Sequence, residues 1–189
     1  VLVDALVGYV GRHKPLVAGL FADLDYSVDP SMDNDDDDRS SSRAAQQKGL
    51  SCTLRAAAVL GCPIQIRIAP RYSHNKNHHH HNTNGYADAM KDLGKILLEE
   101  TSVATTTTTT TTRIHLSCWN GKAEHLMALL TAFPQLLYVG FDGRVSFSKA
   151  AHLHECAFEV PLDRVLLETG CPSSIPSTVA NHLGKDAFC

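Results

Sequence analysis

Segments with helical apolar spacing alternate with short apolar runs along this 189-residue chain. Helical spacing occurs over residues 2–13, 50–60, 86–100, 123–133 and 148–158, and the short runs occupy 16–24, 63–68, 113–118, 136–141 and 164–169. Pro15, Gly61 and Pro134 stand where breaks between such segments are expected. Because this alternation is typical of parallel sheets, the sequence predicts an α/β fold with five strands and five helices.

Three low-complexity stretches interrupt this pattern. The stretch near 29–43 is acidic and serine-rich, the one near 72–85 is rich in histidine and asparagine, and the one near 101–112 is rich in threonine. We expect all three to be solvated loops. They would then be insertions in a single domain that covers residues 1–189.

Two of these stretches contain runs of residues that often bind metal ions. Consecutive histidines such as His78–His81 bind nickel or copper weakly, as a purification tag does, and their asparagine-rich surroundings favour expanded low-complexity sequence. The acidic run Asp33–Asp38 lacks the spacing of a calcium-binding loop. Both runs are better interpreted as solvated linkers.

Composition excludes few classes of function. The net charge of -3 provides no general attraction to nucleic acid, so a phosphate backbone would require a local basic patch or metal ions. No apolar stretch is long enough for a membrane span, and no signal peptide is recognisable, so we expect a soluble intracellular protein, cytoplasmic or nuclear. The six cysteines form no C-x-x-C pair, which favours reduced thiols. Because the chain begins with Val1 and ends abruptly at Cys189, we also expect a fragment or a truncated reading frame.

Several segments carry a family resemblance. Residues 113–121 read RIHLSCWNG, residues 137–143 read LYVGFDG, and residues 160–172 read VPLDRVLLETGCP. These resemble the motifs HCFTG, YIGFxG and IPLDRLLLETDAP of the TatD family of metal-dependent nucleases, in the same order and with similar spacing. Upstream, residues 22–26 and 46–67 are similar to the family's GEIGLDY and its glutamine-rich helix followed by a strand. The resemblance therefore covers nearly all of the structured chain.

The resemblance implies a partial TIM-barrel-like (β/α) fold that corresponds to the last five strand-helix units of a TatD barrel. A complete eight-stranded barrel needs about 250 residues, so this chain is too short to close one. The first three strands, with the family's H-x-H motif, are missing. Because an open barrel exposes two strand edges, a partner chain that completes the barrel is one hypothesis and a rearranged fold is the other.

The family's reaction is phosphodiester hydrolysis assisted by two divalent ions at the carboxyl ends of the strands. The resemblance places a Glu ligand at Phe21, two His ligands at Arg67 and Ser117, and an Asp ligand at Gly170. None of these residues is a normal ligand for zinc, magnesium or manganese. Arg67 would repel a cation, and its alternative role is contact with a phosphate or carboxylate anion.

Neighbouring side chains offer a relocated metal site. Asp23, His115 and Glu168 each lie two residues from a former ligand position, which is about 6 to 7 Å along a strand. That displacement is large compared with the precision of metal coordination. The other interpretation of His115 and Glu168 is a pair of buried polar residues that are hydrogen-bonded within the sheet.

The remaining candidate residues are better explained by packing or exposure. His152 and His154 are two apart on a predicted helix, and His125 is isolated on another, so surface positions are expected. Cys118 adjoins a former ligand position, where core packing explains it. Cys171 also adjoins one, and its role is not indicated by the sequence.

Two functions follow. The first is a degenerate TatD-like protein without hydrolase activity, either a pseudoenzyme or a binding remnant, for which no cofactor is expected. The second is an active nuclease that uses relocated ligands or a completing partner chain and requires Mg²⁺, Mn²⁺ or Zn²⁺. Nucleic acid is the partner that the resemblance implies, and the sequence does not indicate what an inactive chain would bind.

Overall fold

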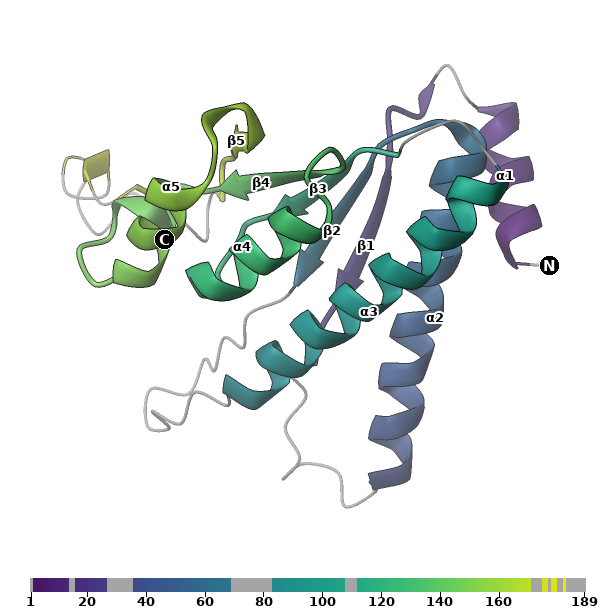
Figure 1. Cartoon of the computed structure of the whole chain (residues 1–189), viewed down its shortest axis with the longest axis horizontal. Coiled ribbons are helices and arrows are strands. Elements are labelled where there is room, and N and C mark those ends of the chain that lie inside the picture. Colours follow the sequence, from purple (N-terminus) through teal and green to yellow (C-terminus); the bar gives the residue numbers. More distant parts are fainter. Residues whose placement is uncertain are drawn as a thin grey trace. The chain divides into compact units, whose positions relative to one another are not determined.

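The computed structural model describes residues 2–13, 16–26, 36–68, 83–107 and 112–170, with residues 175–176, 178–179 and 182 near the end. The chain divides into two compact units, Val1–Ile114 and His115–Cys189. Strands and helices alternate along the chain (Figure 1), and the five strands follow one another in chain order, β1-β2-β3-β4-β5. This order is typical of consecutive strand-helix units, so the predicted α/β, partial TIM-barrel-like fold is confirmed.

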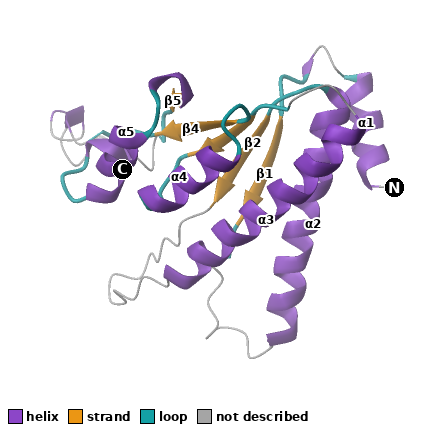
Figure 2. Ribbon diagram, in the orientation of Figure 1, coloured by secondary structure: helices purple, strands orange, loops and turns teal. Residues whose placement is uncertain are grey.

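The first unit contains two parallel strands and three helices (Figure 2). β1 (Leu20–Leu24) pairs in parallel with β2 (Ile64–Ile68), with Asp23 directly opposite Arg67. The helices are α1 (Leu2–Arg12), α2 (Asp36–Leu60) and α3 (Thr83–Thr107). α2 contacts both other helices as well as β1.

The core of this unit follows from the alternation of side chains along β2. Ile64, Ile66 and Ile68 are buried, whereas Gln65 is intermediate and Arg67 is exposed. The fully buried large side chains of the unit are Leu24, Leu50, Ile64, Ile66, Leu93, Leu97 and Ile114. Each such side chain stabilises the fold by about 1.5–3 kcal/mol. The same alternation leaves Arg67 accessible to solvent.

The second unit begins within β3 (Ile114–Ser117), at His115. It also contains α4 (Ala123–Ala132), β4 (Leu137–Phe141), α5 (Ala151–Glu159) and β5 (Val165–Leu167). The 3-10 helices η2 (Gly143–Ser146) and η3 (Leu162–Arg164) precede α5 and β5. β4 and β5 are parallel, with Gly140 opposite Leu166.

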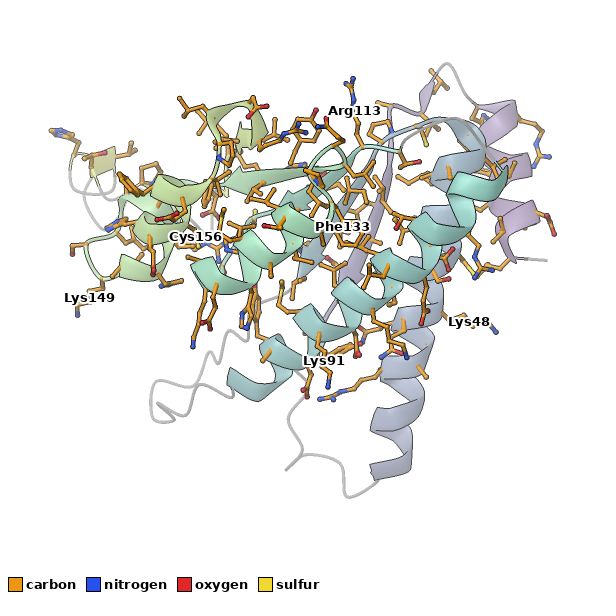
Figure 3. All side chains as sticks on the ribbon, in the orientation of Figure 1. Lys48, Lys91, Arg113, Phe133, Lys149 and Cys156 are labelled. Atoms are coloured by element: carbon orange, nitrogen blue, oxygen red, sulfur yellow. The ribbon has the colours of Figure 1, made fainter. Side chains whose placement is uncertain are left out.

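The core of the second unit is built from β4 and the two helices beside it. Its fully buried large side chains are Leu126, Leu137, Val139, Leu153 and Cys156. Trp119 packs at the end of β3, where its ring N–H is 3.1 Å from the Gly121 carbonyl and 3.3 Å from the Cys156 sulfur. Figure 3 shows Cys156 and Phe133 among other side chains, whereas Lys149 projects outward.

The three stretches predicted to be loops are partly helical, and that prediction is wrong for residues 36–43, 83–85 and 101–107. At the end of α3, the Thr101 hydroxyl donates to the Leu97 carbonyl at 2.7 Å, so threonine is accommodated in a helix. The other parts of these stretches, including His78–His81, lie outside the described residues.

Candidate functional site

Two of the four former ligand positions lie in each unit. Phe21 lies on β1 and is 53% exposed, and Arg67 lies on β2. Ser117 ends β3 and is 6% exposed, and Gly170 follows β5. A phenyl ring, a guanidinium and a glycine offer no side-chain atom that coordinates a divalent cation, and a neutral hydroxyl is a poor substitute for imidazole.

In the first unit, Asp23 and Arg67 form a bidentate ion pair across the two strands. The Arg67 Nε and Nη2 atoms lie 2.9 Å and 2.6 Å from the two carboxylate oxygens of Asp23. The Arg67 guanidinium carbon also lies 5.6 Å from the centre of the Phe21 ring. The Arg67 guanidinium therefore contacts a carboxylate of this chain, and a cation at Asp23 would compete with that contact.

In the second unit, the chain brings Glu168, His115 and Ser117 together. The Ser117 hydroxyl donates to Glu168 Oε1 at 2.7 Å, and the Cys118 backbone N–H donates to Oε2 at 2.5 Å. His115 Nε2 lies 3.3 Å from Oε1, an ion-pair distance that lacks the alignment of a hydrogen bond. The carboxylate is thus enclosed by groups from β3 and the turn after it, which we name the Glu168 cluster.

Backbone features on β4 and β3 make the Glu168 cluster possible. The Glu168 N–H donates to the Phe141 carbonyl, and the Trp119 N–H donates to the Gly140 carbonyl, each at 2.9 Å, so the ends of β5 and β3 flank β4. The Glu168 side chain reaches β3 across Gly140. A Cβ at position 140 would overlap both the Glu168 carboxylate and the His115 ring. Only glycine leaves this space open.

The backbone of Cys118 contributes through an uncommon conformation. Its φ angle is 50°, in the left-handed region that non-glycine residues rarely occupy. Its N–H binds Glu168, while its carbonyl accepts a hydrogen bond from Arg144 Nη2 at 2.7 Å. These two contacts hold the turn after β3. Burial raises the pKa of the Cys118 thiol, which disfavours the nucleophilic thiolate.

The environment of Glu168 strongly favours its charged form. Burial alone would raise its pKa, but His115, the Ser117 hydroxyl and the Cys118 N–H outweigh burial and lower the pKa to about 2. A carboxylate with so low a pKa is a weak general base near neutral pH. The Ser117 hydroxyl donates to this carboxylate, whereas a serine nucleophile of the catalytic-triad type donates to an imidazole.

A second buried ion pair lies beside the Glu168 cluster. Asp142 accepts hydrogen bonds from the Arg144 backbone N–H at 3.0 Å and from Arg144 Nε at 2.9 Å, and both residues are buried. No local pattern in the sequence indicates this pair. It fixes η2, and through the Cys118 carbonyl it supports the turn that binds Glu168.

The first unit also contains a polar network between α2 and α3 that sequence reasoning missed. Gln47 Nε2 donates to Asp92 at 2.8 Å, and the Tyr26 hydroxyl donates to the same carboxylate at 2.9 Å. Burial is the main cause that raises the pKa of Tyr26 to about 12. Gln46, one residue earlier, accepts from the Asp25 N–H at 2.7 Å and donates to its carbonyl at 2.9 Å. The glutamine-rich helix motif was the available signal.

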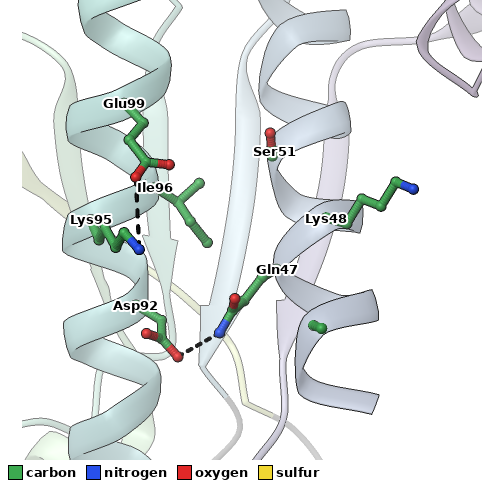
Figure 4. A pocket seen from close by; sticks show the side chains of 8 residues that line it. Gln47, Lys48, Ser51, Asp92, Lys95, Ile96 and Glu99 are labelled. Atoms are coloured by element: carbon green, nitrogen blue, oxygen red, sulfur yellow. Dashed lines mark hydrogen bonds and ion pairs between the residues drawn. The ribbon is translucent and has the colours of Figure 1, made fainter. Parts of the chain in front are cut away.

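A cavity of about 260 Å³ opens between these two helices (Figure 4). It is lined by Ala44, Gln47, Lys48, Ser51, Asp92, Lys95, Ile96 and Glu99. In Figure 4 the Lys48 amine points away from α3. The Lys95 Nζ atom lies 3.9 Å from Glu99 Oε1, which is an ion-pair distance. The charges in the lining are balanced, so the cavity selects no ligand of one sign.

Glu100 of α3 is held by residues of α2. Its carboxylate accepts from Arg55 Nε and Nη2, both at 2.8 Å, and from the Ser51 hydroxyl at 2.5 Å. Burial would raise the pKa of Glu100, but these hydrogen bonds lower it. The contacts tie α2 to α3 and provide no reactive group.

The described residues do not fit the metal ions that the family resemblance implies. Within the described ranges, no three His, Cys, Asp or Glu side chains gather as a metal-binding group. His152 and His154 are exposed on α5, and His125 lies on α4. Cys171 lies outside the described residues. Among the helices that are described, none is both long and apolar enough to span a membrane.

Comparison with known proteins gives three kinds of match. A family model for TatD related DNase matches residues 24–184. The chain is 32% identical over 71 residues to the 3'-5' RNA nuclease TATDN2 of Homo sapiens, covering 38% of this chain and 9% of that protein. It is 33% identical over 89 residues to the uncharacterized metal-dependent hydrolase YabD of Bacillus subtilis (strain 168), covering 47% of this chain and 31% of that protein. A solved xylose isomerase domain protein from Planctomyces limnophilus matches with a TM-score of 0.44 and 13% identity, over 86% of this chain and 58% of that chain.

The chain spans less than two thirds of both curated relatives, since the matches cover 9% and 31% of their lengths.

Proposed function

We propose that this chain, which belongs to the TatD related DNase family, retains the family's strand-helix framework but lacks metal-assisted hydrolysis. Fold does not decide function, whereas the residues at the site do. The proposed role is that of a pseudoenzyme, either a module that binds nucleic acid without cleaving it or a remnant of such a module.

The observation that supports this proposal is the chemistry of the four former ligand positions. The family resemblance places one Glu, two His and one Asp at the positions that here hold Phe21, Arg67, Ser117 and Gly170. Arg67 also adds a permanent positive charge. Hydrolysis by the family's mechanism requires bound cations that activate water and neutralise phosphate charge. With these residues in place, the chain has no donor set for that step at those positions.

A second candidate function is an active metal-dependent nuclease. The proximity of His115 and Glu168 favours it, because an imidazole nitrogen and a carboxylate lie 3.3 Å apart at the end of β3. A curated relative is named as a 3'-5' RNA nuclease, which makes RNA a substrate to test beside DNA. Such a site would need further donors, which a partner chain completing the barrel would supply, and Mg²⁺, Mn²⁺ or Zn²⁺.

The two proposals are distinguished by cleavage of labelled single- and double-stranded DNA and RNA with the purified, folded chain. Each substrate is incubated with Mg²⁺, Mn²⁺ or Zn²⁺ and with a chelator control. We expect no chelator-sensitive cleavage. Cleavage that disappears in His115→Ala and Glu168→Gln, but persists in the exposed-site control Glu159→Gln, would establish the second function.

Binding without cleavage is measured separately on the same labelled strands. Fluorescence anisotropy with the chelator present reports binding that needs no metal. The net charge of -3 provides no general attraction to nucleic acid, so binding would rest on local basic contacts with phosphates. We therefore expect binding to weaken as the salt concentration is raised. Absence of binding to every strand would favour the remnant over the binding module.

A further inference from the structure

The ends of β1 and β2 carry an ion pair in which Arg67 occupies a former ligand position. Asp23 and Arg67 are directly opposite each other in the parallel register. Both oxygens of Asp23 accept a hydrogen bond from the guanidinium, at 2.9 Å and 2.6 Å, which is the fork geometry that favours an arginine over a point charge.

Phe21 completes this arrangement. It lies two residues before Asp23, so both side chains are on the same face of β1. Its ring centre is 5.6 Å from the Arg67 guanidinium carbon, within the range of a cation–π contact. The residue at the former glutamate position therefore contacts the guanidinium through its ring and offers no oxygen to a cation.

We infer that the Arg67 guanidinium has replaced a divalent cation as the positive charge at this strand end, with Asp23 as its carboxylate partner. The inference rests on the proposed loss of the metal site, and it concerns metal uptake and not cleavage. Arg67 is a positioning residue in this sense, because it neutralises and orients Asp23.

Solvent access makes the inference testable. The Arg67 and Asp23 side chains are 48% and 34% exposed, so a dissolved cation can reach them. A divalent ion at Asp23 would have to displace a fixed monovalent cation that already binds both oxygens. Removal of the guanidinium, with an imidazole in its place, would leave a nitrogen and a carboxylate as two adjacent donors.

The test measures Mn²⁺ binding by the loss of its free-solution paramagnetic resonance signal. Mn²⁺ prefers oxygen and imidazole donors, so it avoids the six cysteines better than zinc does. The full chain is used in a background in which His78–His81 are replaced by glutamine, which removes the tag-like run. Four proteins are compared: this parent, Arg67→His, Arg67→Lys, and Asp23→Asn combined with Arg67→His.

We expect Arg67→His to bind Mn²⁺ at least about tenfold more tightly than the parent, because it exchanges a repelling cation for a ligand. Arg67→Lys keeps the cation and is expected to match the parent, and the Asp23→Asn double variant is expected to lose the gain. Equal binding by the parent and Arg67→His, or a gain in Arg67→His that does not depend on Asp23, would overturn the inference.

Two further measurements keep the inference open to refutation. Circular dichroism verifies that each variant is folded. If Arg67→His does not fold, Asp23→Asn in the parent background remains informative, because Mn²⁺ binding by the parent that Asp23→Asn abolishes would contradict the inference. Nuclease activity in the parent would refute the proposed function and leave the result at Asp23 to be judged by metal binding alone.

Discussion

Glu168→Gln removes the charge from a carboxylate that is held by Ser117, the Cys118 N–H and His115. Its pKa is about 2 in the folded chain, against an ordinary value of 4.5. That difference corresponds to about 3 kcal/mol of stability at neutral pH. The side chain is only 13% exposed, so solvent screening reduces this figure little. We expect the variant to lose about 3 kcal/mol at pH 7.

The direction of the pH dependence follows from the lowered pKa of Glu168. A carboxyl group whose pKa falls on folding stabilises the fold fully above its unfolded pKa, and this stabilisation is lost as pH falls from about 4.5 towards about 2. About 2 kcal/mol of the contribution is expected to be lost by pH 3. The difference between the parent chain and Glu168→Gln should therefore shrink as pH falls.

The assay is urea unfolding followed by circular dichroism at several pH values between 7 and 3. Glu159→Gln, an exposed residue at the end of α5, serves as the matched control and should change stability by less than about 0.5 kcal/mol. A cost for Glu168→Gln no larger than that of the control, or a cost that does not change with pH, would refute the account of the Glu168 cluster.

The other predictions concern packing and the α2–α3 contacts, and urea unfolding at pH 7 measures all of them. Gly140→Ala forces a methyl group against the Glu168 carboxylate and should cost at least about 1–3 kcal/mol, whereas an unchanged midpoint would contradict the close approach across β4. Glu100→Gln removes the charged partner of Arg55 and should cost about 1–3 kcal/mol, and the loss should be smaller in an Arg55→Ala background. Gln46→Ala deletes two hydrogen bonds to the backbone of residue 25 and should cost about 1–2 kcal/mol, and a change within error would show that water replaces them.

Much of the fold was predictable because burial imposes local periodicity. Ile64, Ile66 and Ile68 alternate with polar residues, and a half-buried strand is the simplest structure that produces this pattern. The prediction failed at the start of α2, where acidic and serine-rich sequence resembles a linker. There, Arg43 pairs with Asp88 of α3 at 3.3 Å, and its guanidinium lies 4.7 Å from the Tyr26 ring centre. Contacts of such long sequence separation cannot be read from local composition.

The site was predictable only in its residue types. The resemblance located Ser117 and Gly170 as substituted positions, and spacing placed His115 and Glu168 near them. The hydrogen bond between Ser117 and Glu168 joins residues 51 apart and crosses β4 at Gly140, so it depends on strand register that no single segment encodes. The positive φ of Cys118 was also unforeseen, because cysteine gives no local signal for that conformation.

A bound metal ion and an internal ion pair can meet the same physical requirement, which is the compensation of a partly buried carboxylate. A carboxylate in a partly buried position is stable only when charge or hydrogen-bond donors compensate it. A metal ion can provide that compensation, but Arg67 provides it for Asp23, and Ser117 with the Cys118 N–H provides it for Glu168. A donor added at Phe21 alone would therefore meet a carboxylate that Arg67 already satisfies. Reconstruction of a metal site requires removal of the internal partners together with replacement of the ligands, because an added donor alone leaves the competing contacts in place.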